Sequence, residues 1–377
     1  MKNIETVLIH GGEESQHHAG AVVPPIFTSS TYETTSDGPI HYPRLSNTPA
    51  HTILHEKIRS LEGAEASLVA SSGMSAISAT LLTLLDRPSH FIAQRNIYGT
   101  AHHFFTTQLR QMGHEVEFTD LRSAKDLEAL IRPNTRVIYL ESLSNPLLEI
   151  PDFENIIPVA KRKKIWTVMD STFTPPTIFR PLDLGIDVNL HSATKYLNGH
   201  SDVLAGAISG SRSVVHSIRD TLKNLGGSLD GFSAYLLNRG LKTLPLRMEA
   251  IQKNTLRIAK GLEALPKIQR VFYPGLESHP QSERARKYFR GFGGVIAFET
   301  DASLPELPQR LEKLQIIQYA PSLGGVESLI TLPWKTSHSF LSEEERARIG
   351  IGRNLVRLSV GLEHPDDLLE DLKSALS

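Results

Sequence analysis

VNLHSATKYLNGHSD, residues 188–202, joins a short apolar strand to a turn that contains a single lysine. After the turn, LAGAISG (204–210) has the apolar clustering of a second buried strand. Lys195 lies between the two strands without an adjacent charge, although a lysine on a solvated face normally has charged neighbours. A half-buried lysine is costly unless it has a partner. Lys195 therefore either pairs with a carboxylate from elsewhere in the fold or carries an amine that takes part in chemistry.

The same alternation of apolar strand and polar turn extends along the chain on both sides of this stretch. Runs such as RVIYLES (136–142) and WTVMD (166–170) alternate with segments of helical periodicity. Alternation over roughly 150 residues predicts an α/β fold with a mostly parallel sheet and helices on both faces. After about residue 240, a long helical run (248–265) precedes several strand-like runs and a closing helix, which predicts a smaller C-terminal α+β domain.

The first 48 residues differ from the rest in composition. They are rich in proline, serine, threonine and histidine and show no strand or helix periodicity. Such a segment cannot bury itself alone, so we expect it to lie across another surface. The chain is therefore predicted to have three parts: an arm (1–48), an α/β domain (49–240) and an α+β domain (241–377).

The composition excludes several classes of function. The net charge is −1 and charged residues make up 21% of the chain, so no basic surface for nucleic acid is expected. The absence of cysteine excludes disulfides, thiolate metal sites and cysteine nucleophiles, and it fits a reducing cytoplasm. No signal peptide and no apolar run of about 18 residues is present, so we expect a soluble, cytoplasmic protein without a membrane partner.

Polar residues follow the predicted strands, where an open α/β sheet binds its ligands. SSGM (71–74) opens a helix, which either binds an anion or only caps the helix. Asp170 ends an apolar strand and needs a cation, either an arginine or a protonated pyridine nitrogen. Tyr98 either stacks on a flat ligand or packs against the protein. Together with Lys195, these features describe a site for pyridoxal 5′-phosphate (PLP).

Rival sites are poorly supported by the residues. No GxGxxG motif opens a helix after a strand, and no GxxxxGK[ST] motif occurs, so dinucleotide and P-loop sites are not expected. His51 and His55 have the helical spacing of a metal site, but Thr52 stands where a metalloprotease has its glutamate. We therefore expect no metal.

At this point several longer motifs become recognisable. SSGMSAI, VIYLESLSNP, VMDSTF, HSATKYLNGHSDV, NRGLKTLPLRMEA and SLGGVESLI together resemble the cystathionine lyase and cystathionine synthase family, from about residue 8 to the C-terminus. These are PLP enzymes of methionine and cysteine metabolism with the fold of aspartate aminotransferase (fold type I). The resemblance implies a carbon–sulfur lyase that acts on cystathionine or related sulfur amino acids by β- or γ-elimination. The alternative is a γ-replacement on an activated homoserine, as in cystathionine γ-synthases.

The resemblance also implies roles for individual residues. Lys195 would bind the cofactor aldehyde and then move protons, and Tyr98 would be the second catalytic residue while also stacking on the ring. The other implied cofactor-binding residues are Gly73, Met74, Asp170, Thr172, Ser192 and Thr194, with Tyr42 and Arg44 reaching from the arm into a neighbouring subunit. The implied substrate-binding residues are Asn145, Ser322 and Arg357. The implied assembly is a homotetramer built from dimers with shared active sites.

The sequence departs from the family at positions linked to substrate choice. Pro321 stands where many members have a glutamate, and His41 stands where an acid often precedes the Tyr-x-Arg motif. His102 and His103 lie in a run that usually contains an arginine. Because two carboxylates are missing, we expect weaker binding of the distal ammonium group of cystathionine. The choice between elimination and replacement stays open.

Overall fold

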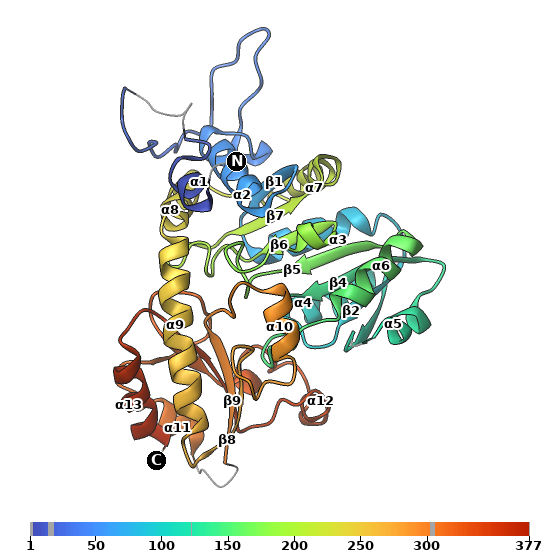
Figure 1. Cartoon of the computed structure of the whole chain (residues 1–377). Coiled ribbons are helices and arrows are strands. Elements are labelled where there is room, and N and C mark those ends of the chain that lie inside the picture. The colour runs from blue at the N-terminus through green and yellow to red at the C-terminus, as the bar shows by residue number, and fades with distance from the viewer. Residues whose placement is uncertain (1–2, 14–18, 122, 302–305, 377) are drawn as a thin grey trace.

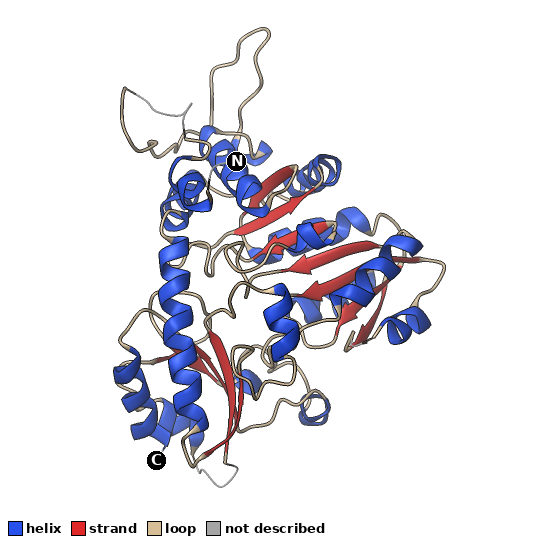
Figure 2. Ribbon diagram, viewed as in Figure 1, coloured by secondary structure: helices blue, strands red, loops and turns tan. Residues whose placement is uncertain are grey.

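The computed structural model describes residues 3–13, 19–121, 123–301 and 306–376, which form two sheets with surrounding helices (Figures 1 and 2). The strands of the larger sheet are β1 (Ala66–Ala70), β2 (His90–Gln94), β3 (Glu115–Thr119), β4 (Thr135–Glu141), β5 (Trp166–Asp170), β6 (Val188–His191) and β7 (Gly206–Gly210). The strands of the smaller sheet are β8 (Ile268–Phe272), β9 (Val295–Thr300), β10 (Gln318–Tyr319), β11 (Leu329–Thr331) and β12 (Leu355–Ser359).

Helices surround both sheets. The helices are α1 (Ile4–His10), α2 (Pro49–Glu62), α3 (Gly73–Leu84), α4 (Gly99–Phe104), α5 (Ala124–Leu130), α6 (Phe153–Lys163), α7 (Arg212–Asn224), α8 (Gly231–Leu241), α9 (Leu244–Glu263), α10 (Ser282–Tyr288), α11 (Leu307–Leu311), α12 (Glu343–Arg348) and α13 (Pro365–Leu376). None of those described is long and apolar enough to cross a membrane.

The larger sheet has the strand order β1-β7-β6-β5-β4-β2-β3. The pairs from β6 through β5, β4 and β2 to β3 are all parallel, and β7 alone runs antiparallel to its neighbours β6 and β1. The predicted mostly parallel sheet is confirmed. Because β4, β5 and β6 are parallel neighbours, their carboxyl ends meet at one edge of the sheet.

Both faces of this sheet are covered, as its sequence pattern predicts. Val137 and Tyr139 of β4 pack into a cluster with α3 and α7, whereas Ile138 and Leu140 pack into a second cluster with α2, α6 and α8. Successive side chains of a strand point to opposite faces, so a run that is apolar throughout requires a helix layer on each side. The predicted α/β arrangement is confirmed.

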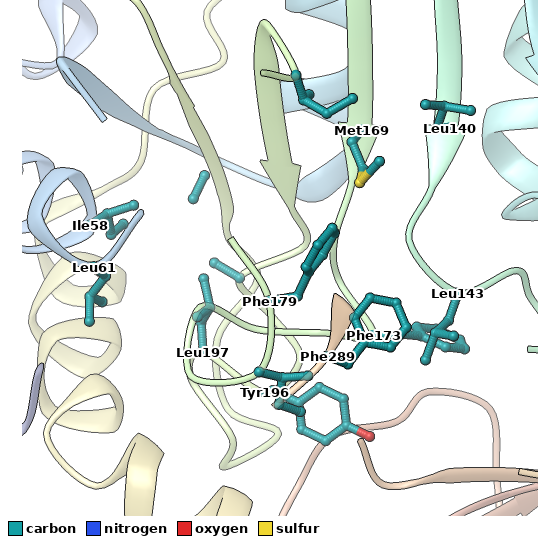
Figure 3. Packing of buried hydrophobic residues seen from close by; sticks show 14 of the residues in the cluster. Ile58, Leu61, Leu140, Leu143, Met169, Phe173, Phe179, Tyr196, Leu197 and Phe289 are labelled. Carbon is teal, nitrogen blue, oxygen red and sulfur yellow. The ribbon is translucent and has the colours of Figure 1, made fainter. Parts of the chain in front are cut away.

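The long helix α9 connects the larger sheet to the smaller one (Figure 1). Its first half contributes Met248 and Ile251 to the core beneath the larger sheet, and its second half contributes Ile258 and Leu262 to the core of the smaller sheet. Figure 3 shows aromatic side chains of the first core, including Phe173, gathered beyond the ends of β4 and β5. The two halves of the chain therefore share packed apolar surface.

The N-terminal segment is not irregular throughout, as the sequence pattern suggested. Residues 4–10 form α1, because Leu8 is fully buried against Leu54 and Ile58 of α2 in the main core. The prediction failed here because a single buried side chain in a short helix leaves no visible periodicity. Residues 19–42 do lack helix and strand, and in Figure 1 the N-terminal loops project away from both sheets. The three-part division of the chain stays a prediction.

A buried polar cluster anchors the start of the chain. The carboxylate of Glu13 accepts hydrogen bonds of 2.9 Å from Lys57 Nζ, Asn238 Nδ2 and Lys242 Nζ. Burial alone would raise the pKa of Glu13, but these three donors outweigh it and the pKa is lowered. Burial lowers the pKa of Lys57 to about 8 despite its bond to Glu13. The cluster fixes α1 and the following residues against α2 and α8.

The substitution Glu13→Ala should destabilise the protein by about 3–5 kcal/mol, because it leaves the fully buried Lys57 without its carboxylate. Since folding lowers the Glu13 pKa, this contribution is present above pH 4.5 and is lost as the pH falls through the folded-state pKa. Denaturant unfolding at several pH values measures it. Glu56→Ala, which breaks an exposed pair with Arg59, should cost about 0–1 kcal/mol, and an equal loss for both variants would contradict the prediction.

Candidate active site

A cavity of about 970 Å³ lies at the carboxyl ends of β4, β5 and β6. Its walls come from both halves of the chain, with α3 and α4 on one side and, on the other, residues 321–323, 336, 337, 339 and 340. It brings together most of the predicted site residues: Gly73, Met74, Tyr98, Asn145, Asp170, Thr172, Ser192, Thr194, Lys195, Ser322 and Arg357. Tyr42 and Arg44 do not line it. They lie exposed in the N-terminal segment, with the Arg44 guanidinium 5.5 Å from the centre of the Tyr42 ring.

Lys195 occupies the predicted turn after β6. Its Nζ donates a 2.6 Å hydrogen bond to Ser322 Oγ, and no carboxylate in the described chain lies within ion-pair distance of it. The interpretation of Lys195 as half of an ion pair is therefore wrong. Burial, and then repulsion from Arg357, lower the pKa of Lys195 to about 8. A larger fraction of the amine is neutral at physiological pH than in an exposed lysine.

Side chains from the C-terminal half hold this turn in place. The guanidinium of Arg247 on α9 is buried and donates to the carbonyl oxygens of Tyr196 and Gly240, each at 2.8 Å. The Tyr196 hydroxyl accepts from the Gly294 N–H at 3.1 Å. The bond to Tyr196 satisfies a carbonyl group of the turn, and the bond to Gly240 ties the same guanidinium to α8. They fix the backbone from which the Lys195 side chain extends into the cavity.

Asp170 ends β5 and is 8% exposed. Its Oδ1 accepts bonds from Thr172 N at 2.9 Å and Thr172 Oγ1 at 2.5 Å, and Thr172 Oγ1 in turn accepts from the Ser192 N–H at 2.7 Å. Burial raises the pKa of Asp170 in spite of the Thr172 bonds. No lysine or arginine in the described chain lies within ion-pair distance of Asp170, so a structural arginine does not balance its charge.

Glu141 is a second buried acid of the cavity, and the sequence pattern marked it as a polar residue after a strand without indicating a role for it. It ends β4 directly beside Asp170 in the register of the sheet, and its Oε1 accepts from the Tyr98 N–H at 2.6 Å. Burial, and then the charge of Asp170, raise the pKa of Glu141 well above its usual value. The sequence held a usable signal, because Glu141 follows an apolar strand in the same way as Asp170 does.

The first turn of α3 faces Ser192. Ser72 caps this helix by accepting from the Ser75 N–H at 3.0 Å. A side chain at Gly73 would lie 2.8 Å from the Ser192 Cβ, so only glycine lets the helix approach so closely. The first N–H groups of a helix have no partner inside it, and α3 presents them to the cavity. The Thr194 hydroxyl bonds to the backbone of Ala205 and closes the base of the lysine turn.

Arg357 of β12 lies opposite the strand ends and is 6% exposed. Its Nη1 donates to Asn145 Oδ1 at 3.2 Å and its Nη2 to the Ser322 carbonyl at 2.9 Å, while its Nε is buried without a partner. Burial lowers the pKa of Arg357 to about 10. Ser322 has φ of +97°, a strained conformation for a residue with a side chain. A buried guanidinium with an unused donor is suited to bind a carboxylate.

Of the four positions at which the sequence departs from the family, two line the cavity and two do not. Pro321 and His103 line the cavity. His102 instead stacks on Phe118 with ring centres 4.4 Å apart, and His41 Nδ1 bonds to the Asn47 carbonyl at 2.7 Å. Phe340 and the neighbouring Thr336, Ser337 and Ser339 also line the cavity, which no pattern predicted because they lie in a loop without periodicity.

The comparisons with known proteins agree with this arrangement. The family model described as "Cys/Met metabolism PLP-dependent enzyme" matches residues 5–377.

The chain belongs to this family.

Its relatives cover nearly the whole chain. The cystathionine gamma-lyase of Bacillus subtilis is 40% identical, over 99% of this chain and 98% of its own. The cystathionine beta-lyase of Coxiella burnetii is also 40% identical, with the same coverage. A crystal structure of cystathionine gamma-synthase from Xanthomonas oryzae superimposes with a TM-score of 0.95 at 34% identity, over 100% of this chain and 98% of that chain. The predicted family, fold class and PLP cofactor are confirmed.

Two features of the cavity in this protein show that it fits PLP. Asp170 is a buried carboxylate with no lysine or arginine within ion-pair distance among the described residues, and the nearby His191 is itself bonded to Glu62, so a protonated pyridine nitrogen would complement Asp170. Gly73 leaves the first turn of α3 open beside Ser192, where a phosphate group would meet unpaired N–H groups. The residues present are therefore of the right type for both ends of the cofactor.

In the cofactor-free protein, Lys195 should react with an amine reagent such as acetic anhydride with half-maximal rate near pH 8, because its pKa is lowered to about 8. Arg357→Leu should move this midpoint to higher pH, since it removes a repelling charge. Peptide mapping by mass spectrometry follows the labelling, and exposed lysines of the same chain supply the reference profile. A Lys195 profile identical to theirs would show that the turn does not perturb the amine.

Proposed function

We propose that this protein is a PLP-dependent carbon–sulfur lyase that cleaves cystathionine or a related sulfur amino acid by β- or γ-elimination. The proposal is carried by the position of Lys195, whose Nζ lies 2.6 Å from Ser322 Oγ in the same cavity as Asp170 and Arg357. The relatives named cystathionine gamma-lyase and cystathionine beta-lyase support the same reaction class.

The cofactor would be held at three places. The Asp170 carboxylate would pair with the pyridine nitrogen, and Thr172 would keep that carboxylate oriented through its two hydrogen bonds. The ring of Tyr98, which lines the cavity and is 42% exposed, would stack on the cofactor ring. The phosphate would be bound by backbone N–H groups and hydroxyls of Gly73, Met74, Ser192 and Thr194.

When bound, PLP supplies an aldehyde that binds amines covalently and a protonated ring that takes up the electrons released at the substrate α-carbon. Arg357 would bind the substrate α-carboxylate, with Asn145 and Ser322 beside it. Lys195 Nζ, displaced by the substrate amine, would remove the proton from Cα. Its lowered pKa suits this step, because a base is most effective when its pKa is near the working pH.

Breaking of the C–S bond would complete the β-elimination. The bonding electron pair leaves Cβ with the sulfur, and the protonated Lys195 can return its proton to the thiolate. Hydrolysis of the remaining fragment gives pyruvate and ammonia. γ-Elimination needs one further proton removal, from Cβ, and the same amine could perform it.

The alternative reaction is γ-replacement, in which the cysteine thiol forms a bond to Cγ of an activated homoserine and the activating group leaves from Cγ. The solved cystathionine gamma-synthase with a TM-score of 0.95 supports it, because a near-identical fold can carry that reaction. Both reactions would use Lys195, Asp170 and Arg357 in the same roles. They differ in whether a second amino acid enters the cavity, which product analysis can distinguish.

The assembly is part of the proposal. Tyr42 and Arg44 lie outside the cavity, in a segment whose exposed apolar residues include Val22, Ile40 and Tyr42 itself. A neighbouring subunit would cover such a surface and receive Arg44 at its phosphate site. We accordingly propose a cytoplasmic homotetramer built from dimers, in which the 1–48 arm reaches across and the 49–240 and 241–377 domains enclose each cavity.

The purified enzyme should be yellow from bound PLP and should release either pyruvate with homocysteine (β-elimination) or 2-oxobutyrate with cysteine (γ-elimination) from L-cystathionine. Lys195→Ala should abolish turnover while keeping some cofactor through the phosphate contacts. Product chromatography and the absorption spectrum measure both. If neither product pair forms and the enzyme instead joins cysteine to an activated homoserine, the lyase proposal is wrong and γ-replacement is the reaction.

Arg44→Ala should weaken PLP retention, although Arg44 lines no cavity of its own subunit. Mixing Arg44→Ala with Lys195→Ala subunits should restore roughly a quarter of wild-type activity, because half of randomly paired dimers would contain one intact shared site. Activity after subunit exchange, compared with each variant alone, is the measurement. Absence of recovery in verified hybrids would contradict a shared site.

A further inference from the structure

The formal charges of the cavity are concentrated at its inner end. The carboxylates Glu141 and Asp170 stand at the ends of β4 and β5, where Glu141 accepts from the Tyr98 N–H and Asp170 accepts from Thr172. The cations are Lys195, bonded to Ser322, and Arg357, bonded to Asn145 and the Ser322 carbonyl. Among the described residues that line the cavity, these four are the only carboxylates, lysines and arginines.

The outer wall has a different character. Phe340 is 42% exposed and stands beside His103, with ring centres 6.4 Å apart in an edge-on arrangement. Pro321 and the exposed Leu204 also line the cavity. The polar atoms of the outer wall are hydroxyls of Thr100, Thr336, Ser337 and Ser339 and the ring nitrogens of His103. The wall offers apolar contact and neutral hydrogen bonds.

This wall is held in place by direct packing of α4 against the 337–340 segment. A side chain at Gly99 would collide with the Ser337 carbonyl and with the Phe340 ring, so the two segments touch at the glycine. The rings of His102 and His338 lie 5.2 and 6.3 Å from Phe340, measured between centres, and restrict it from two further sides. Phe340 is thus positioned before any substrate enters.

Nearby acids outside the cavity are already engaged. Glu327 accepts a hydrogen bond from the Ser201 hydroxyl, and Glu345 accepts from the Ser342 N–H at 2.8 Å in the cap of α12. Neither lines the cavity. Among the described residues of one subunit, none that lines the outer wall would give a charged group an opposite charge in exchange for the water it loses, which is unfavourable, whereas an alkyl or aryl group would gain apolar contact.

We infer that the cavity selects amino acid thioethers whose group beyond the sulfur is uncharged, and that Phe340 and His103 form the wall that contacts this group. This inference rests on the proposed carbon–sulfur lyase function. It names S-alkyl- and S-arylcysteines as the preferred substrate class, ahead of substrates with a charged distal end such as cystathionine.

Three substrates of closely matched length test it on the PLP-loaded enzyme: S-propyl-L-cysteine, S-(2-aminoethyl)-L-cysteine and S-(2-carboxyethyl)-L-cysteine. We expect kcat/KM for the propyl compound to exceed both others by about ten- to a hundredfold, the usual range for one unmatched contact. Dissociation constants for the PLP-loaded Lys195→Ala protein, measured by calorimetry, should follow the same order. Equal or better use of either charged compound would overturn the inference.

Two substitutions test the wall itself. Phe340→Ala should lower the preference for S-propyl-L-cysteine about tenfold, and Phe340→Glu should shift it towards the aminoethyl compound. Met112→Ala, which removes an exposed apolar side chain outside the cavity, should leave the substrate ratio unchanged. If the ratio of kcat/KM values for the propyl and aminoethyl compounds is the same in both Phe340 variants as in the wild type, the wall does not select the substrate. This conclusion holds even if both variants are less stable.

The test separates the two proposals. If the carbon–sulfur lyase function is wrong, none of the three compounds will yield pyruvate, yet the order of their dissociation constants still reports on the outer wall. If only the inference on selectivity is wrong, pyruvate will form but the charged compounds will compete equally with the uncharged one.

Discussion

The parallel pairing of β4, β5 and β6 is the constraint on which the site depends. Its register sets Glu141 beside Asp170 and Asp170 beside Leu190, so the polar ends of three strands meet at one edge. The antiparallel β7 begins at the edge where β6 ends. The connection between them must therefore cross this edge, and Lys195 lies within that connection. Strand direction thus brings the lysine into the same cavity as the buried carboxylates.

Burial is the main cause of the shifted pKa values in the cavity. It lowers the pKa of Lys195 and Arg357 and raises the pKa of Asp170 and Glu141, in each case as the largest cause. Removal from water disfavours every charged form, so each group gains from a ligand of opposite charge. A protonated pyridine nitrogen beside Asp170 and a carboxylate beside Arg357 would both supply one. The same cost explains why the outer wall, which lacks such partners among its described residues, favours neutral groups.

The C-terminal half is part of the site and does more than cover it. Arg247 and Gly294 bond to the turn that carries Lys195, and Ser322 bonds to its amine. Because α9 has one end in each apolar core, a shift between the halves would disturb both cores and the turn together. The distance between strand ends and Arg357 is therefore set by core packing.

The sequence alone was sufficient for the α/β class and the mostly parallel sheet, and it named most of the residues that gather in the cavity, although not Glu141. Apolar runs with a polar residue at their end carry that information locally, as at Asp170, and the turn around Lys195 is specific in its residue types. Other features could be found only from the tertiary structure. They are the short helix α1, the stacking of His102 on Phe118, and the places of Phe340 and His103 in the cavity wall. Those features depend on contacts between segments far apart in the chain, such as α4 with the 337–340 loop, and no local pattern encodes such a contact. The sequence thus determined which chemistry the chain can hold, and long-range packing decided which groups surround the place where a substrate would lie.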